Sequence, residues 1–127
     1  MQQKHLFEYA VIRVVPRVER EEFMNIGVIL YCAKEKFLQT RYQLDEDRLK
    51  AFCIGVDLDE FKEHLCSFER ICMGEKAAGP IGKLDIASRF RWLTAARSTV
   101  LQTSKVHPGM TADALQTLDR LFQQLVL

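Results

Sequence analysis

The stretch from Phe7 to Tyr42 most constrains the fold, because three β-strand patterns follow one another there. Phe7–Val15 is apolar on both faces, which predicts a central strand rather than an edge strand. Phe23–Cys32 and Phe37–Tyr42 are separated by a short polar turn, which predicts a hairpin. We therefore expect three antiparallel strands in a meander, with the rest of the chain packed on them.

The second of these strands contains a glycine at position 27. Strict alternation places Asn25 and Gly27 on one face of the strand, and Ile26 and Val28 on the other. Glycine inside a strand commonly marks a β-bulge or the close approach of another chain or ligand. We therefore expect an irregularity of the sheet at Gly27.

Helical patterns dominate the rest of the chain. Asp57 is a good N-cap for a long helix that ends near Gly74. Its apolar residues recur at three- and four-residue steps: Leu58, Phe61, Leu65, Phe68 and Cys72. A final helix capped by Thr111 has a similar stripe: Leu115, Leu118, Leu121, Phe122 and Leu125. Shorter helices are expected within Leu44–Gly55 and Ile86–Ala96.

A late segment completes the predicted sheet. Thr99–Val106 favours a strand through its threonine and valine content, and the sequence from His107 to Gly109 predicts a turn after it. Glu75–Lys83, with two glycines and a proline, predicts a flexible loop. The expected fold is α+β, with a mainly antiparallel sheet of about four strands (the meander plus one late strand), covered by helices near 57–73 and 111–126. A length of 127 residues predicts one domain, 1–127.

Composition and cysteine spacing limit the classes of protein. Hydrophobic residues make up 48% and charged residues 28% of the chain, as in ordinary globular proteins. The N-terminal residues lack the apolar run of a signal peptide. The cysteines form no CxxC pair and have no histidine at zinc-finger spacing: Cys32, Cys53, Cys66 and Cys72. We therefore expect a cytoplasmic protein with reduced thiols, no membrane segment, no metal site and no cofactor.

The first candidate site consists of polar residues within the predicted strands: Arg13, Asn25, Arg41 and Gln102. A buried arginine needs a partner, and amide side chains beside it can supply hydrogen bonds. If these residues share one face of the sheet, they form a site for an anion or a peptide terminus. The alternative is that each occupies an edge or solvent-facing position.

The second candidate is a basic segment, because residues 76–110 carry six basic residues against Asp85 alone. The candidate basic patch within it consists of Arg89, Arg91, Arg97 and Lys105. Arginine interleaved with Phe90 and Trp92 is a composition used to bind phosphate ligands and nucleic acids. A solvated helix face or a surface for an acidic protein partner explains the same pattern.

The third candidate is His107, which is followed by proline and glycine and preceded by Ser98 and Thr99. A histidine in a rigid turn can act as a general base toward a hydroxyl group, as in a hydrolase or transferase. The GxSxG nucleophile motif is absent, so a structural turn histidine is the alternative. No complete catalytic constellation is present, and the sequence favours a protein that is not an enzyme.

Three blocks of the chain resemble one known family. They are YAVIRVVPRVEREEFMNIGVILYC at Tyr9–Cys32, FRWL at Phe90–Leu93 and RSTVLQTSKVHPG at Arg97–Gly109. On these blocks the chain resembles the bacterial family catalogued as domain of unknown function 3037, over nearly its whole length. The resemblance implies no activity and no catalytic residue. Lys105 departs from an otherwise small or apolar stretch and receives no role from it.

The resemblance also suggests a context, because members of this family are often encoded beside a HipA-type kinase-like protein. It implies a small accessory or regulatory protein with such a partner. Its blocks contain the residues that we expect to form a ligand-binding surface: Arg13, Asn25, Arg97, Gln102 and His107. The leading hypothesis is a non-catalytic binding protein, and the phosphate or nucleic-acid binder and the His107 enzyme are its alternatives.

Overall fold

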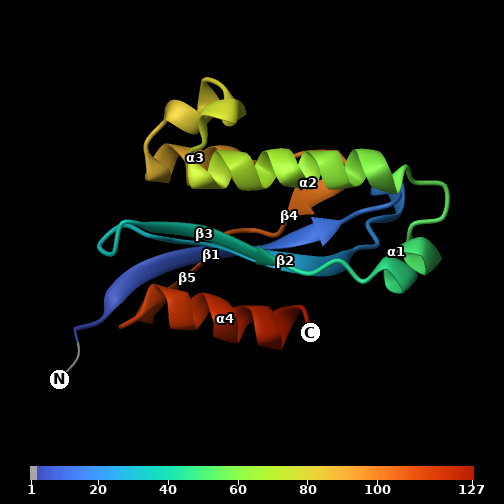
Figure 1. Cartoon of the computed structure of the whole chain (residues 1–127). Helices are drawn as coiled ribbons and strands as arrows, with labels where there is room; N and C mark the ends of the chain where they lie inside the picture. The colour runs from blue at the N-terminus through green and yellow to red at the C-terminus, as the bar shows by residue number, and fades with distance from the viewer. Residues whose placement is uncertain (1–2) are drawn as a thin grey trace.

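A computed structural model of the chain describes residues 3–127 as one sheet with helices on both faces (Figure 1). The strands are β1 (His5–Val14), β2 (Met24–Cys32), β3 (Phe37–Tyr42), β4 (Leu101–Thr103) and β5 (His107–Thr111). The α-helices are α1 (Glu46–Phe52), α2 (Leu58–Met73), α3 (Ile86–Leu93) and α4 (Ala114–Leu125). The predicted α+β fold is confirmed. Within the described residues, no helix has the length and apolar character needed to cross a membrane.

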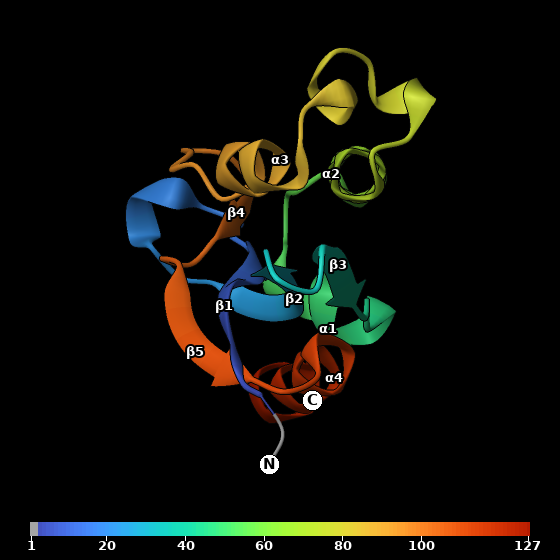
Figure 2. The same ribbon diagram turned by 90° about the vertical axis from the view of Figure 1, so that its left-hand side faces the viewer.

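β1 is the central strand, as its two apolar faces predict. One of its edges pairs with β2, which in turn pairs with β3, and its other edge pairs with both β4 and β5 (Figure 2). Ser104 lies between those two strands and continues the ladder. Its backbone N–H donates to the carbonyl of Val11, and its hydroxyl accepts from the N–H of Val11, each at 2.8 Å.

The predicted turn after the late strand is in fact a fifth strand. His107–Thr111 pairs with the first half of β1, and Pro108 lies opposite Glu8. Proline is tolerated there because β5 is an edge strand, and its missing N–H leaves no partner unsatisfied within the sheet. The final helix is consequently capped by Asp113, whose side chain accepts from the N–H of Gln116, rather than by Thr111.

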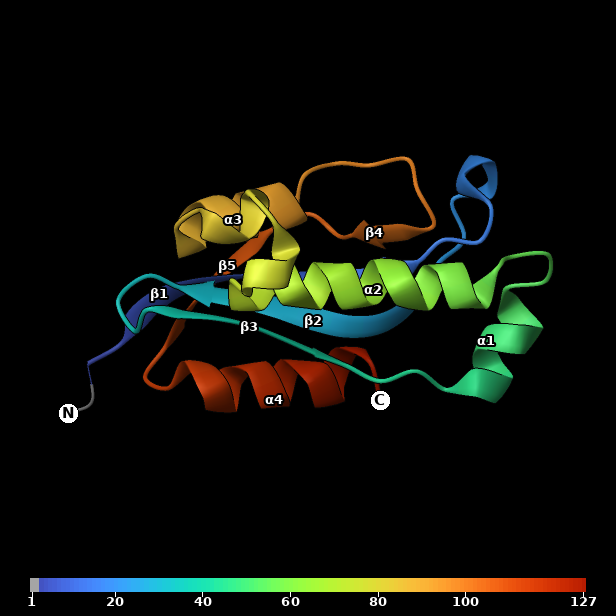
Figure 3. The ribbon, with the colours of Figure 1, turned by 45° about the horizontal axis from the view of Figure 1, so that its top comes forward.

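One face of the sheet, here called the α2 face, is covered by α2 and α3 (Figure 3). The predicted cap and stop of α2 are confirmed, since Asp57 accepts from the N–H of Glu60 and Gly74 adopts the left-handed conformation. The core of this face is continuous: Ala10, Ile12, Val14, Ile26, Ile29, Leu38, Leu49, Cys53, Phe61, Leu65, Phe68, Ile71, Cys72, Phe90 and Leu93 are all buried.

The opposite face, here called the α4 face, is covered by α4. The buried set there is smaller: Phe7, Val28, Leu30, Cys32, Ala114, Leu118, Leu121 and Phe122. Leu115, expected in the stripe of α4, is 52% exposed, whereas Ala114 and Thr117 are buried. The stripe that contacts the sheet therefore runs through positions 114, 117, 118, 121 and 122.

The remaining segments are short. α1 is capped by Asp45, and α3 ends at Leu93, earlier than the predicted helix Ile86–Ala96. Charged residues after β1 form the single-turn 3-10 helix Val18–Arg20, as expected for a surface turn. The expected loop at Glu75–Lys83 contains two further 3-10 turns, at Lys76–Ala78 and Ile81–Lys83.

Candidate functional site

A β-bulge in β2 decides which face carries the candidate polar residues. Ile12 pairs with Gly27, but Arg13 pairs with Asn25, so Ile26 is the extra residue. A bulge changes the alternation of side chains along its strand. Asn25 therefore lies on the α4 face with Arg13, and Ile26 enters the core of the α2 face. The predicted faces of Asn25 and Ile26 were wrong for this reason.

The irregularity expected at Gly27 is present. Besides adjoining the bulge, Gly27 lies close to the backbone of β3. A Cβ at this position would lie 2.7 Å from the carbonyl oxygen of Arg41 and 2.7 Å from Cβ of Tyr42. Real Cβ contacts are not this short, so the pairing of the two strands here requires glycine.

Three polar residues lie side by side on the α4 face, across β2, β1 and β4. Arg13 is opposed by Asn25 on one side and by Gln102 on the other. Directly opposed residues of an antiparallel pair point to the same face, with Cβ atoms about 4.5–5.5 Å apart. The ring of Phe23 covers the guanidinium, whose carbon lies 3.8 Å from the ring centroid. We call these four residues the Arg13 cluster.

The guanidinium of Arg13 is a cation without an internal counterion. Across residues 3–127 no carboxylate lies within ion-pair distance of it. Its Nε is buried and has no hydrogen-bond partner in the same range. Burial lowers the pKa of Arg13, because desolvation penalises the charged form. The side chain nevertheless stays charged near neutral pH, so an anion bound here would gain a charge-assisted hydrogen bond.

The amides of the cluster add an acceptor next to this donor. Nδ2 of Asn25 donates to the carbonyl of Leu125 at 3.1 Å, at the end of α4. This bond fixes the orientation of the amide and leaves Oδ1 buried, with no partner in the described part of the chain. Nε2 of Gln102 donates to the carbonyl of Thr99 at 2.8 Å. An unpartnered donor and an unpartnered acceptor therefore lie on opposed residues of β1 and β2.

Arg41, the fourth polar residue of the first candidate site, also lies on the α4 face, where it pairs with Val28. It forms an ion pair with Asp119 of α4. Its guanidinium carbon lies 5.1 Å from the centroid of the Phe122 ring. Arg41 thus links β3 to α4 through this ion pair, and its guanidinium already has a counterion.

His107 lies on the same face but outside the cluster. It pairs with Tyr9, and the two ring centroids are 5.3 Å apart. Tyr9 and Arg13 are four residues apart on β1, which corresponds to about 13 Å of strand. The structure therefore places His107 along the same strand as the cluster, stacked on a tyrosine.

Arg97 lies elsewhere, at the end of α3 on the α2 face. It donates to the carbonyls of Leu93 at 2.9 Å and Trp92 at 2.6 Å. Its guanidinium carbon lies 4.5 Å from the centroid of the Trp92 ring. Of the five residues predicted to form one surface, Arg13, Asn25 and Gln102 meet, His107 is a neighbour and Arg97 is separate.

The arginines of the basic segment are engaged within the protein. Arg89 donates to the carbonyl of Leu84 at 2.7 Å. Arg91 forms a bidentate pair with Glu8, at 2.6 and 2.7 Å, and lowers the pKa of that carboxyl through the hydrogen bond. Lys105 is exposed in the connection between β4 and β5. The three arginines of this segment therefore contact oxygen atoms of the protein itself, although Nε of Arg89 is buried without a partner in the described residues.

His107 and the hydroxyl residues Ser98 and Thr99 lie far apart along β1. Val100 is hydrogen-bonded to Val15, whereas His107 pairs with Tyr9. Six residues of strand separate these positions on β1, or about 20 Å. General base catalysis requires hydrogen-bond reach, so the geometry provides no support for this pair.

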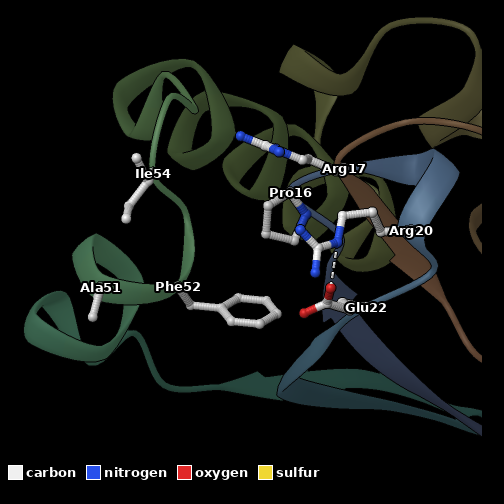
Figure 4. Close-up of a pocket in the computed structure, with 7 residues that line it drawn as sticks. All are labelled: Pro16, Arg17, Arg20, Glu22, Ala51, Phe52 and Ile54. Carbon is white, nitrogen blue, oxygen red and sulfur yellow. Dashed lines mark ion pairs between the residues drawn. The ribbon is translucent and has the colours of Figure 1, made fainter.

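A pocket that the sequence did not reveal lies at the end of the sheet, between the β1–β2 connection and α1 (Figure 4). Its volume is about 340 Å³, and its lining residues are Pro16, Arg17, Arg20, Glu22, Ala51, Phe52 and Ile54. The Arg20–Glu22 ion pair lies opposite the ring of Phe52. Among the described lining residues none is a histidine, cysteine or hydroxyl residue, so the pocket offers apolar and charged contacts rather than a nucleophile.

The fold and these surfaces define the class as a small α+β domain with a polar cluster on one sheet face. The chain belongs to the family described as "Protein of unknown function (DUF3037)", which matches residues 9–126. This confirms the resemblance drawn from the three sequence blocks. The chain matches no curated protein and no solved structure.

Proposed function

We propose that this protein is a non-catalytic binding module whose Arg13 cluster receives an acidic peptide segment of a partner protein. The observation that carries the proposal is that a hydrogen-bond donor and an acceptor, both without partners, lie on directly opposed residues of β1 and β2. Nε of Arg13 lacks an acceptor and Oδ1 of Asn25 lacks a donor, and both atoms are buried within the described structure.

The chemistry of these two atoms favours a peptide over a simple anion. Phosphate and other bare anions offer acceptors to Arg13 but little donor capacity for Asn25. A peptide carries carboxylate or carbonyl acceptors together with backbone N–H donors, and so offers partners to both groups once the side chains of Arg13 and Asn25 turn to expose them. The exposed ring of Phe23, which is 46% accessible, adds an apolar contact beside them.

The phosphate-ligand or nucleic-acid alternative receives less support. It depends on cations that are free to contact phosphates. Arg89, Arg91 and Arg97 instead contact carbonyl and carboxylate oxygens of the protein itself. The enzyme alternative depends on His107 and a hydroxyl that lie far apart on β1.

Family context suggests the identity of the partner. Because members of this family are often encoded beside a HipA-type kinase-like protein, we propose a protein of that type as the partner, with the present chain as its regulatory or accessory subunit in the cytoplasm. An acidic segment of the partner would lie against the Arg13 cluster.

The test is co-expression with a HipA-type kinase-like protein, followed by size-exclusion chromatography and calorimetry at micromolar concentrations. A stable complex is expected. Arg13→Met keeps most of the volume of the side chain but removes its charge, and it should weaken the complex by about 10- to 100-fold, the range for a lost charge-assisted hydrogen bond.

Arg91→Met is the matched control, because it removes the same charge from an exposed arginine that is already paired with Glu8. It should leave the affinity within about threefold of wild type, as expected for a site remote from the interface. Separate elution of the two proteins would reject the partner. A complex that Arg13→Met leaves unchanged would reject the Arg13 cluster as its binding site.

A further inference from the structure

We propose that His5, Cys32 and Glu35 form a binding site for a divalent metal ion, with zinc as the best-fitting ion. The site lies where the start of β1 meets the β2–β3 hairpin, apart from the Arg13 cluster. Nδ1 of His5 lies 3.4 Å from Oε2 of Glu35, and Sγ of Cys32 lies 3.8 Å from the same oxygen. All three ligand atoms lie within 4.8 Å of one another.

These spacings fit a tetrahedral centre. Zinc binds sulfur at about 2.3 Å and nitrogen or oxygen at about 2.0–2.2 Å, so its ligand atoms are separated by roughly 3.3–3.6 Å. The ligand atoms lie up to 4.8 Å apart, so the widest pair would close by about 1.2–1.5 Å, which side-chain rotation can supply. Three protein ligands leave the fourth position for water.

The type of donor decides between ions. A set of one thiolate, one imidazole and one carboxylate is borderline soft, which favours zinc over magnesium or calcium. In the structure the Cys32 thiol donates to Oε2 of Glu35 at 3.8 Å, and binding of an ion would displace that proton and leave a thiolate beside the carboxylate. A divalent ion offsets both charges.

The surrounding structure holds the three ligands in place while leaving access from solvent. Cys32 is fully buried in the core of the α4 face. His5 and Glu35 are each about a quarter exposed, at 24% and 25%, so an ion can enter from their side.

A further hydrogen bond orients the carboxylate. Oε1 of Glu35 accepts from the backbone N–H of Ala114, the first residue of α4, at 3.1 Å. This contact leaves Oε2 directed at His5 and Cys32. Hydrogen bonds of this kind to a ligating group are a regular feature of metal sites. The ion would therefore link three segments that are distant in sequence: the start of β1, the β2–β3 hairpin and, through Glu35, the start of α4.

No motif marks this site in the sequence, because its ligands do not follow a metal-binding spacing. Cys32 and Glu35 are three residues apart across a hairpin turn, and His5 joins them only through the pairing of β1 with β2. A cysteine followed by a glutamate is not a zinc motif by itself.

The experiment is titration of the reduced, tag-free protein with Co²⁺, followed by displacement with Zn²⁺. Thiolate coordination to Co²⁺ produces a charge-transfer absorption in the near ultraviolet, which imidazole and carboxylate ligands alone do not give. We expect this band to saturate at one equivalent of Co²⁺ and to disappear when Zn²⁺ is added.

The variants separate this site from adventitious binding. Cys32→Ser should abolish the charge-transfer band. His5→Gln and Glu35→Gln alter partly exposed side chains and should weaken binding at least about tenfold. Cys66→Ser, at an exposed free cysteine, and His64→Gln, beside Glu60 on the surface of α2, are the controls and should bind as wild type.

Three outcomes would overturn the proposal: no band in the wild-type protein at millimolar Co²⁺, a band that persists in Cys32→Ser, or one that is lost in Cys66→Ser. Circular dichroism of each metal-free variant separates a lost ligand from a lost fold. If Cys32→Ser does not fold, His5→Gln and Glu35→Gln decide the result, and wild-type affinity in both would reject the site.

Discussion

The two faces of the sheet are covered to different extents, and this difference locates the candidate binding surface. On the α2 face, two helices meet a continuous apolar core that extends from β3 to β1. On the α4 face, a single helix lies mainly over β2 and β3 (Figure 2). The side of that face formed by the end of β1 and by β4 carries Arg13 and Gln102 in place of apolar residues.

Along β1, apolar side chains lie where helices cover the sheet, and a charged side chain lies where they do not. β1 contributes Ala10, Ile12 and Val14 to the α2 face, where all three are fully buried. Its other side changes from Phe7, buried under α4, to Arg13, which is only partly covered. The same strand therefore supplies core on one side and a potential recognition surface on the other.

The largest change in the free energy of unfolding should come from a substitution in the core of the α2 face. Phe61→Ala removes a side chain that is 2% exposed, and it should lower the free energy of unfolding by about 3–5 kcal/mol. Urea denaturation measures the change. Ile54→Ala, at a residue 74% exposed, should change it by less than about 0.5 kcal/mol. A cost below about 1 kcal/mol for Phe61→Ala would mean that this core is not the main source of stability.

A smaller change in the free energy of unfolding is expected from a substitution in the Arg13 cluster. Arg13→Met removes a desolvated charge that has no internal counterion and keeps the packing of the aliphatic stem. The free energy of unfolding should stay within about 1 kcal/mol of wild type, in either direction. A loss above about 2 kcal/mol in urea denaturation would show that Arg13 is primarily structural, and the contrast between the faces would then fail.

The smallest effect concerns the ion pair between α3 and β1. The hydrogen bond from Arg91 lowers the pKa of Glu8 in the folded state. The ion pair therefore adds to the free energy of unfolding at pH values above the pKa that Glu8 has in the unfolded chain. This contribution is lost as the pH falls through the lower pKa that Glu8 has in the folded state. Because Arg91 is 55% exposed, the increment should be below about 1 kcal/mol.

Comparison of wild type with Glu8→Gln at pH 7 and at pH 2 checks this sign. Wild type should be slightly more stable at pH 7, and the difference should vanish in acid. A difference that persists or grows in acid would contradict the assigned role of Glu8.

Local patterns predicted those parts of the fold that local chemistry decides. Asp57 and Gly74 bound α2 as expected, because capping depends on residues adjacent in sequence. The central place of β1 followed from its two apolar faces. The strand β5 was missed because proline and glycine favour a turn, and only pairing with the distant start of β1 makes the segment extended.

The candidate site was predictable in composition but not in geometry. Arg13, Asn25 and Gln102 could be named as polar residues within strands. Their convergence depends on the bulge at Ile26, which reverses the face of Asn25, and on the register between β1 and β4. Register is set by pairing across the whole sheet, so no short window contains it. Arg97, which follows α3, was predicted to join the cluster but is held by carbonyls at the C-terminal end of that helix.

The pairing of β1 with β4 and β5 also has a consequence for the order of events during synthesis. β1 leaves the ribosome well before the strands that complete its second edge, which begin at Leu101. At roughly 5–20 residues per second, that edge stays open for on the order of 5–20 s. An open edge of an apolar strand is a template for pairing with other chains. During synthesis the second edge of β1 therefore stays open until β4 and β5 have formed.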